Sequence, residues 1–390
     1  MTVILNKTKH SNFFSKKLFL VLLCLFSLTV NLFAVTDFYW EKQKVISTND
    51  SYFPRTLESK NKSYAFWQEV DRDKNQIWIS CRVYDNFNKY EDKRRFAGPF
   101  IYSGEIPDIY SVEISDSGTV LIAITETTSG ISIYSSDDGC NTFASNKIPT
   151  SNTMIAPRIY YSSNKKFRLF ASVMQDDTFQ LLYTESKDGK TWSSFKRFNP
   201  GYQYRNPFYP VSVRTSNGDM IVFQAQYESS VINRFSYQLF VTTTRDGSSW
   251  STPVMITDES SLLDSDEKNF AEYQNQRPSL IRFKDKNYLA WERTDVINSS
   301  IWVTEITSKG IVPKTITRLT ERGSASRALL FEYDDNLYVE WFDNRSGKDC
   351  VYLAQMIGFD WEESILIENA YDNTFPTPLF IKDDYNKRRF

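Results

Sequence analysis

The chain has 390 residues, of which 41% are hydrophobic, 24% charged and 16% aromatic, and its formal net charge is −2. This composition is typical of a globular protein and excludes a disordered chain, which would have fewer hydrophobic residues and a larger net charge. The only histidine is His10, in a segment that we expect to be removed. A mature protein without histidine cannot use Ser-His-Asp or Cys-His nucleophile pairs, histidine metal sites or imidazole acids and bases.

Residues 1–34 are organised like an export signal. An almost wholly apolar run over 18–28 follows a basic stretch, and Ala34 is a suitable last residue before cleavage. The basic residues are Lys7, Lys9, Lys16 and Lys17. We predict a signal peptide over 1–34 and export of the mature protein to the periplasm, the cell surface or the medium, with no membrane span left after cleavage.

Two other interpretations of this segment stay open. An uncleaved anchor would have to use the run 18–35, which polar residues interrupt and which is marginal for spanning ~30 Å of hydrocarbon. A lipoprotein site at Cys24 would have Leu23 at a position where a small residue is expected.

Charge and cysteine content limit the partners. Without residues 1–34 the chain has 42 Lys and Arg against 48 Asp and Glu, and no basic cluster dominates any segment, so we expect no nucleic-acid partner. The remaining cysteines, Cys81, Cys140 and Cys350, form no CxxC pair and make a poor zinc site, so we expect no metal and no cofactor. One disulfide with one free thiol is compatible with export, but we favour three buried core cysteines.

An internal repeat organises the rest of the chain. Similar segments begin at prolines that are 53, 50, 50 and 71 residues apart, and a sixth begins near Ser326 without a proline. These prolines are Pro54, Pro107, Pro157, Pro207 and Pro278. The third segment shows four short strands, over 158–161, 167–173, 179–184 and 195–198. About 50 residues and four strands per unit predict an all-β, six-bladed β-propeller of four-stranded antiparallel blades.

The predicted domain covers residues 35–390, and we expect it to be a monomer. Its blades are expected near 54–100, 107–148, 157–199, 207–257, 278–319 and 326–368, and residues 375–390 begin an incomplete extra strand.

Three hairpins between the third and fourth strands share one sequence pattern. Each has a hydroxyl residue, then Asp-Gly, then an aromatic residue, over 136–143, 186–192 and 244–250. The Asp accepts backbone N–H hydrogen bonds and the Gly takes a positive φ, which together form a tight turn. We assign a structural role to Ser136, Asp138, Gly139, Ser186, Asp188, Gly189, Trp192, Asp246, Gly247 and Trp250.

These hairpins resemble the Asp-box, or BNR, repeats of sialidase-like propellers. In the family the Asp-boxes lie on the face opposite the pocket. The resemblance therefore implies that the pocket is formed by the starts of first strands and the loops between second and third strands. Candidate binding residues there are Arg55, Arg158, Arg277, Arg327, Arg293 and Tyr209, and candidate catalytic residues are Asp71 and Glu69.

Arginines around a carboxylic acid suit an anionic sugar, because guanidinium groups bind carboxylates bidentately. The resemblance implies an arginine triad, an acid/base Asp and a Tyr nucleophile activated by Glu. Arg55, Asp71 and Arg293 stand near three of these positions. The positions of the second arginine, the Glu and the Tyr hold Gln226, Tyr209 and Ser326.

This mixed match favours an exported, diverged propeller that binds a glycan or protein ligand without hydrolysing it. One alternative is an active exo-glycosidase of sialidase type, acting on anionic sugars. A second is an envelope scaffold or interaction protein, because propellers host unrelated functions. The arginines and the loop carboxylates would then be ordinary solvated or inter-blade residues.

Overall fold

The computed structural model describes residues 50–59, 62–85, 91–126, 130–198, 205–229, 234–257, 273–294, 298–321, 324–348, 350–358, 360–367, 381–382 and 388–389. Nearly all of them belong to one compact unit, residues 45–388. The other unit, residues 1–44 with 389–390, is described only at Arg389. The predicted signal peptide and most of the predicted extra strand over 375–390 therefore lie outside the described residues.

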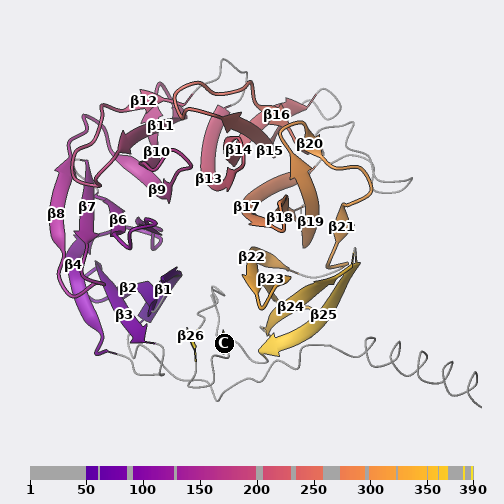
Figure 1. The fold of residues 1–390 in the computed structure, drawn as a ribbon, viewed down its shortest axis with the longest axis horizontal. Coiled ribbons are helices and arrows are strands. Elements are labelled where there is room, and N and C mark those ends of the chain that lie inside the picture. Colours follow the sequence, from indigo (N-terminus) through magenta and orange to yellow (C-terminus); the bar gives the residue numbers. More distant parts are fainter. Residues whose placement is uncertain are drawn as a thin grey trace, which may run out of the picture. The chain divides into compact units, whose positions relative to one another are not determined.

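Six antiparallel sheets form the blades of a β-propeller, as the repeat predicted (Figure 1). Each blade is a meander in which sequential strands pair, and this arrangement confirms the predicted fold class. The described residues contain strands and no helix, and so none that could span a bilayer.

The strands of the first three blades follow the chain in order. Blade 1 contains β1 (Asp50–Ser59), β2 (Lys62–Asp71), β3 (Gln76–Asp85) and β4 (Arg94–Ile101). Blade 2 contains β5 (Tyr110–Ile114), β6 (Val120–Thr125), β7 (Ile131–Ser136) and β8 (Ala144–Ile148). Blade 3 contains β9 (Met154–Tyr161), β10 (Phe167–Gln175), β11 (Thr178–Ser186) and β12 (Lys196–Arg197).

The last three blades continue the same order. Blade 4 contains β13 (Arg205–Thr215), β14 (Gly218–Ser229), β15 (Arg234–Thr244) and β16 (Val254–Met255). Blade 5 contains β17 (Gln274–Phe283), β18 (Lys286–Thr294), β19 (Ser299–Thr307) and β20 (Gly310–Ile311), with β21 (Thr317–Arg318) also paired to β19. Blade 6 contains β22 (Ser326–Tyr333), β23 (Asn336–Asp343), β24 (Cys350–Ile357) and β25 (Asp360–Ile367). A separate pair contains β26 (Ile381–Lys382) and β27 (Arg388–Arg389).

Four of the five repeated prolines mark irregularities in the first strands. The residue before the proline has a positive φ at Phe53 (51°), Ala156 (50°), Asn206 (49°) and Arg277 (52°). Arg327 adopts the same conformation at 60° without a following proline. The ladder register shifts at each of these places, which is the signature of a β-bulge. Bulges re-aim side chains, and here they set the direction of the residues at the strand starts.

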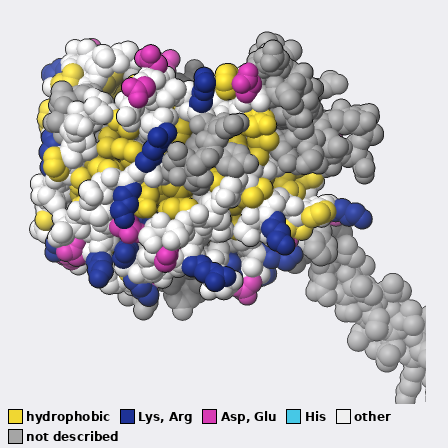
Figure 2. All heavy atoms as spheres, turned by 90° about the horizontal axis from the view of Figure 1, so that it is seen from above, with side chains coloured by type: hydrophobic (Ala, Val, Ile, Leu, Met, Phe, Trp, Pro, Cys, Tyr) yellow, Lys and Arg dark blue, Asp and Glu magenta, His cyan; other side chains and the backbone are white. Residues whose placement is uncertain are grey.

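Apolar side chains fill the spaces between neighbouring blades. The tryptophans that recur at the same place in their blades, Trp67, Trp291 and Trp341, are all buried. Trp291 stacks on Trp302 within blade 5, and Trp341 stacks on Tyr352 within blade 6. Figure 2 shows hydrophobic side chains gathered in a band along one side of the molecule, with charged side chains of both signs above and below it. The three described cysteines are buried free thiols.

The three Asp-Gly hairpins have closely similar hydrogen bonding. An oxygen of Asp138 accepts from two backbone N–H groups at 3.0 Å, and the corresponding oxygens of Asp188 and Asp246 each accept two at 2.8 Å. The following glycines have φ values of 74°, 71° and 77°. Backbone donors from Thr191 and Lys190 lower the pKa of Asp188 to about 2. The aspartates therefore serve the turn geometry.

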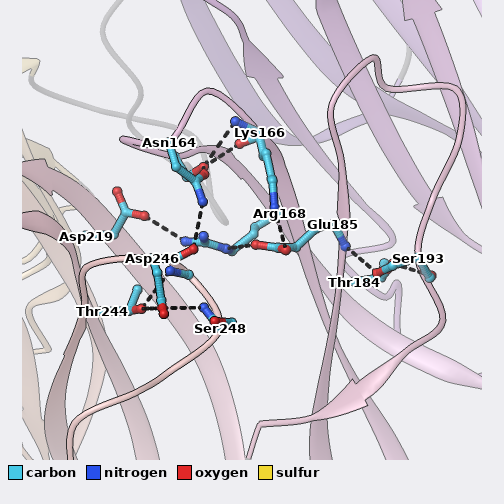
Figure 3. Close-up of polar contacts among 12 residues, drawn as sticks. Asn164, Lys166, Arg168, Thr184, Glu185, Ser193, Asp219, Thr244, Asp246 and Ser248 are labelled. Carbon is cyan, nitrogen blue, oxygen red and sulfur yellow. Dashed lines mark hydrogen bonds and ion pairs between the residues drawn. The ribbon is translucent and has the colours of Figure 1, made fainter.

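Each of these glycines also packs on the preceding blade. A Cβ at Gly139 would meet Lys62 of blade 1, one at Gly189 would meet Leu121 of blade 2, and one at Gly247 would meet Arg168 of blade 3. Arg168 is fully buried and joins blades 3 and 4, because it bonds Glu185 at 2.6 Å and Asp219 at 2.7 Å (Figure 3). The hairpins thus help to align successive blades.

Candidate functional site

A cavity of about 1310 Å³ lies among the first strands and is lined by residues of all six blades. Its polar lining is dominated by arginine. Four of the arginines are those predicted at first-strand starts, Arg55, Arg158, Arg277 and Arg327, and Tyr209 also lines the cavity. Each of these four arginines lies in or directly after one of the bulges described above. In blade 1, for example, the register of β1 shifts just before Arg55. The structure therefore brings five predicted binding residues together.

Arg55 and Arg158 share one carboxylate. Nη2 of Arg55 lies 2.6 Å from Oδ2 of Asp108, and Nη2 of Arg158 lies 3.1 Å from the same oxygen. These residues come from blades 1, 2 and 3, so Asp108 holds guanidinium groups from both neighbouring blades. One negative charge against two positive charges leaves this cluster with a net charge of about +1.

Two tyrosine rings support the same pair of arginines. The guanidinium carbon of Arg55 lies 5.2 Å from the ring centre of Tyr110, and that of Arg158 lies 5.2 Å from the ring centre of Tyr209. The hydroxyl of Tyr110 donates to the carbonyl of Phe53 at 2.6 Å, which connects blade 2 to the bulge of blade 1. Ring contacts of this kind restrict the arginine side chains and favour their charged form.

Arg277 and Arg327 form a second cluster around Glu292. Nη1 of Arg277 lies 2.9 Å from one oxygen of Glu292, and the backbone N–H of Arg327 donates to the other oxygen at 2.9 Å. The Glu292 side chain is only 4% exposed, whereas that of Arg277 is 48% exposed. The buried carboxylate of Glu292 therefore holds the more exposed guanidinium of Arg277 in place at the cavity.

Burial and like charge perturb the arginines in the cavity. Burial, with a smaller effect from neighbouring Arg277, lowers the pKa of Arg327 to about 10. Burial also lowers the pKa of Arg158, where Asp108 opposes the shift and Arg55 adds to it. The negative charge of an anion in the cavity would offset the cost of this burial and repulsion, because opposite charge favours the ionised guanidinium.

The predicted catalytic carboxylates are not among the residues that line the cavity. Glu69 is 1% exposed and is paired with Lys93 at 2.7 Å and Arg95 at 2.6 Å. Asp71 lies at the end of β2 and bonds Lys74 at 2.8 Å, which lowers the pKa of Asp71. Their catalytic roles remain predictions.

The predicted binding residue Arg293 is also not among the residues that line the cavity. It is buried, with its guanidinium carbon 3.8 Å from the ring centre of Tyr273 and 5.0 Å from that of Trp302. Its role as a triad arginine likewise remains a prediction.

Two carboxylates that line the cavity, Asp108 and Glu113, were not among the residues selected from the sequence. Asp108 follows the repeated proline Pro107, which was a usable signal. Glu292 was expected on this face from its place between the second and third strands, but its pairing with Arg277 was not predicted. Burial raises the pKa of Glu113 to about 7. Among the described residues, no group of three or more His, Cys, Asp or Glu side chains is arranged to hold a metal ion.

Comparisons with known proteins locate this fold among enzymes that act on polysaccharides and glycosides. An ulvan lyase representing a new family of polysaccharide lyases aligns over 84% of this chain and 88% of its own, with 12% identity and a TM-score of 0.55. An α-L-arabinofuranosidase of Fusarium graminearum aligns over 78% of this chain and 92% of its own, with 14% identity and a TM-score of 0.52. These similarities establish a shared fold.

A sialidase of Trypanosoma rangeli is also among the similar structures. It aligns over 80% of this chain and 55% of its own, with 11% identity and a TM-score of 0.47. No protein-family model and no curated protein matches the sequence.

The arrangement is suited to binding anions. Four guanidinium groups from four blades line one cavity, and Asp108 and Glu292 beside them are already engaged by arginine. Because the guanidinium groups are already held in position, they lose little conformational entropy when they bind a carboxylate or sulfate.

Proposed function

We propose that this protein binds an anionic saccharide in its central cavity and does not hydrolyse it. The convergence of Arg55, Arg158, Arg277 and Arg327 on one cavity supports the proposal. The chain as a whole is slightly acidic, so this cluster of cations is a local feature. The cavity lining contains five arginines and three acidic residues, and such an excess of positive charge concentrates anionic ligands.

The fold supports a saccharide as the ligand. The lyase and the arabinofuranosidase that share the fold act on sugars, and one ulvan lyase structure contains a bound segment of glucuronate and sulfated rhamnose. A uronate or sulfated sugar has the anionic groups that arginine recognises and hydroxyl groups that suit a polar cavity.

The engagement of the carboxylates supports binding without hydrolysis. Glycosidases use two carboxyl groups about 5–9.5 Å apart on either side of the scissile bond. Here Asp108 is bonded by two arginines, and Glu292 by Arg277 and the backbone of Arg327. Ser326 occupies the position at which the sialidase-like pattern has its Tyr.

We further propose that the three Asp-Gly hairpins are Asp-boxes of a sialidase-like propeller and that the chain is exported after cleavage near Ala34. Their shared hydrogen bonds and positive glycine φ values support the first point. The basic and apolar organisation of residues 1–34 supports the second.

The test is calorimetric titration of the purified full chain with acidic and neutral oligosaccharides of equal length. We expect the acidic ligand to bind at least 10-fold more tightly, with affinity that falls as salt rises. Equal affinity for both ligands would contradict an anion site. Release of sugar from the acidic ligand, lost in Asp71→Asn, would instead support the exo-glycosidase alternative. Binding to neither ligand, together with capture of an envelope protein, would support the scaffold alternative.

A further inference from the structure

We propose that the cavity contains two separate anion subsites on opposite sides of the channel, and that its ligand is an acidic oligosaccharide with at least two anionic groups. This inference rests on the proposed function and specifies its substrate class. In a cavity with a single anion site, by contrast, all four arginines would surround one carboxylate of the ligand.

The arginines are divided into two clusters by their carboxylate partners. Asp108 holds Arg55 and Arg158, and Glu292 holds Arg277 while accepting from the backbone of Arg327. Each cluster contains two cations and one anion, so each has a net charge of about +1. Each is therefore neutralised by one carboxylate or sulfate group of a ligand.

The ring topology places the clusters apart. Asp108 precedes β5 of blade 2, and Glu292 is on β18 of blade 5. In a ring of six blades, blade 2 lies directly across the channel from blade 5 (Figure 1). One small anion cannot contact both carboxylate-centred clusters if they occupy opposite walls.

For Arg158 and Arg327, the nearby Arg, Asp and Glu charges that shift the pKa belong to the same cluster as the arginine, and Tyr209 also acts on Arg158. The pKa of Arg158 responds to burial and then to Asp108 and Arg55. The pKa of Arg327 responds to burial and then to Arg277 and Glu292. The electrostatic grouping thus agrees with the grouping by contacts.

The cavity size also favours a ligand longer than one sugar. Its volume of about 1310 Å³ exceeds the roughly 300–1,000 Å³ typical of pockets for single small ligands. Between the clusters, blade 4 contributes Tyr209, whose ring already contacts Arg158. Apolar residues Val211 and Leu280 continue the wall toward blade 5. A sugar ring linking two acidic units could pack on this surface.

The experiment compares glucuronic acid with a tetrasaccharide that alternates glucuronate and a neutral sugar, and with a sulfated tetrasaccharide of equal length. Affinities are measured for the full chain and for Arg158→Gln, Arg327→Gln and the double variant. Arg197→Gln is the matched control, because Arg197 is exposed on β12, bonds Gln180 and is not among the residues that line the cavity. Arg158→Lys and Arg327→Lys retain the charge, and melting temperatures report on folding.

Two subsites predict a distinctive pattern. At least one tetrasaccharide should bind at least 10-fold more tightly than glucuronic acid, and each single Gln variant should lose about 10-fold in tetrasaccharide affinity. The same variants should lose no more than about twofold for glucuronic acid, because either subsite accepts it, and only the double variant should abolish its binding. The Lys variants should retain most of the affinity and the control all of it.

Other outcomes separate the two levels of the proposal. Equal affinity for mono- and oligosaccharide, or complete loss of both ligands in one single Gln variant, would overturn the two-subsite inference and leave anion binding intact. Failure of the wild-type chain to bind any acidic ligand would overturn the proposed function as well.

Discussion

The guanidinium group of Arg168, in blade 3, lies against the backbone of Gly247 in the Asp-Gly hairpin of blade 4. A Cβ at position 247 would overlap Nη2 of Arg168. Arg168 is restrained from moving aside, because Glu185 and Asp219 hold it (Figure 3). The ring of Trp250 also lies 5.6 Å from its guanidinium carbon. Position 247 therefore needs a glycine for two reasons: a side chain there would overlap Arg168, and the backbone φ is 77°.

Gly247→Ala should destabilise the protein more than the backbone conformation alone explains. Gly347 is a matched control, because its φ is 80° and a Cβ there would meet nothing within 4 Å. We expect Gly347→Ala to lower the free energy of unfolding by about 1 kcal/mol and Gly247→Ala by about 3 kcal/mol. Denaturant unfolding of both variants measures the difference. Equal losses would show that Arg168 does not constrain the hairpin.

Glu69 should contribute stability that disappears in acid. Although burial opposes its ionisation, hydrogen bonds from Lys93, Arg95 and Trp67 lower the pKa of Glu69 to about 2 from its usual 4.5. The folded state thus favours the ionised form, so the contribution is present above pH 4.5 and is lost as the pH falls toward 2. Unfolding curves of the wild type and Glu69→Gln should converge over this range. A constant difference between them would contradict the assignment.

Glu340 should have the opposite pH dependence. It is 3% exposed, its Oε1 has no hydrogen-bond partner among the described residues, and burial raises its pKa to about 8. Because the folded state holds the proton, the stabilising contribution is present below about pH 4.5 and declines as the pH rises to 8. Glu340→Gln should therefore gain about 2–4 kcal/mol relative to the wild type between pH 5 and pH 8. A pH-independent effect on unfolding would argue against a buried neutral carboxyl.

The ring of Tyr209 should contribute more to ligand affinity than its hydroxyl does. Tyr209→Phe preserves the ring beside Arg158, whereas Tyr209→Leu removes it. We expect the Phe variant to bind the acidic tetrasaccharide within twofold of the wild type, and the Leu variant to lose about three- to tenfold, since a contact of this kind is worth roughly 0.5–1.5 kcal/mol. Calorimetric titration distinguishes the two. A large loss in the Phe variant would assign the main role to the hydroxyl.

The blade architecture could be predicted because its signals are local and repeated. Each proline marks a first strand, and each Asp-Gly hairpin closes an outer pair of strands, so their spacing reveals the repeat. The prolines also explain why Arg55, Arg158 and Arg277 were placed correctly at the cavity. The bulges themselves were not predicted, because a positive φ at Phe53 or Ala156 has no clear sequence signal.

The surroundings of the carboxylates depend on tertiary contacts and could not be predicted. Glu69 resembled a loop acid near the pocket, but it pairs with Arg95, on the fourth strand of its own blade, and with Lys93 just before that strand. Asp108 gains its role from arginines about 50 residues away on either side. No local pattern shows which charges will meet across blades.

The prolines of the first strands have a consequence for what can enter the channel. A first strand is the free inner edge of its blade, and such an edge would normally offer backbone donors to an incoming strand. Pro54, Pro157, Pro207 and Pro278 have no N–H, and the bulges beside them interrupt the regular spacing of the remaining groups. The channel wall is therefore a poor template for β-augmentation. A polypeptide tail would gain little from its backbone there, which leaves the channel to ligands that are recognised by side chains.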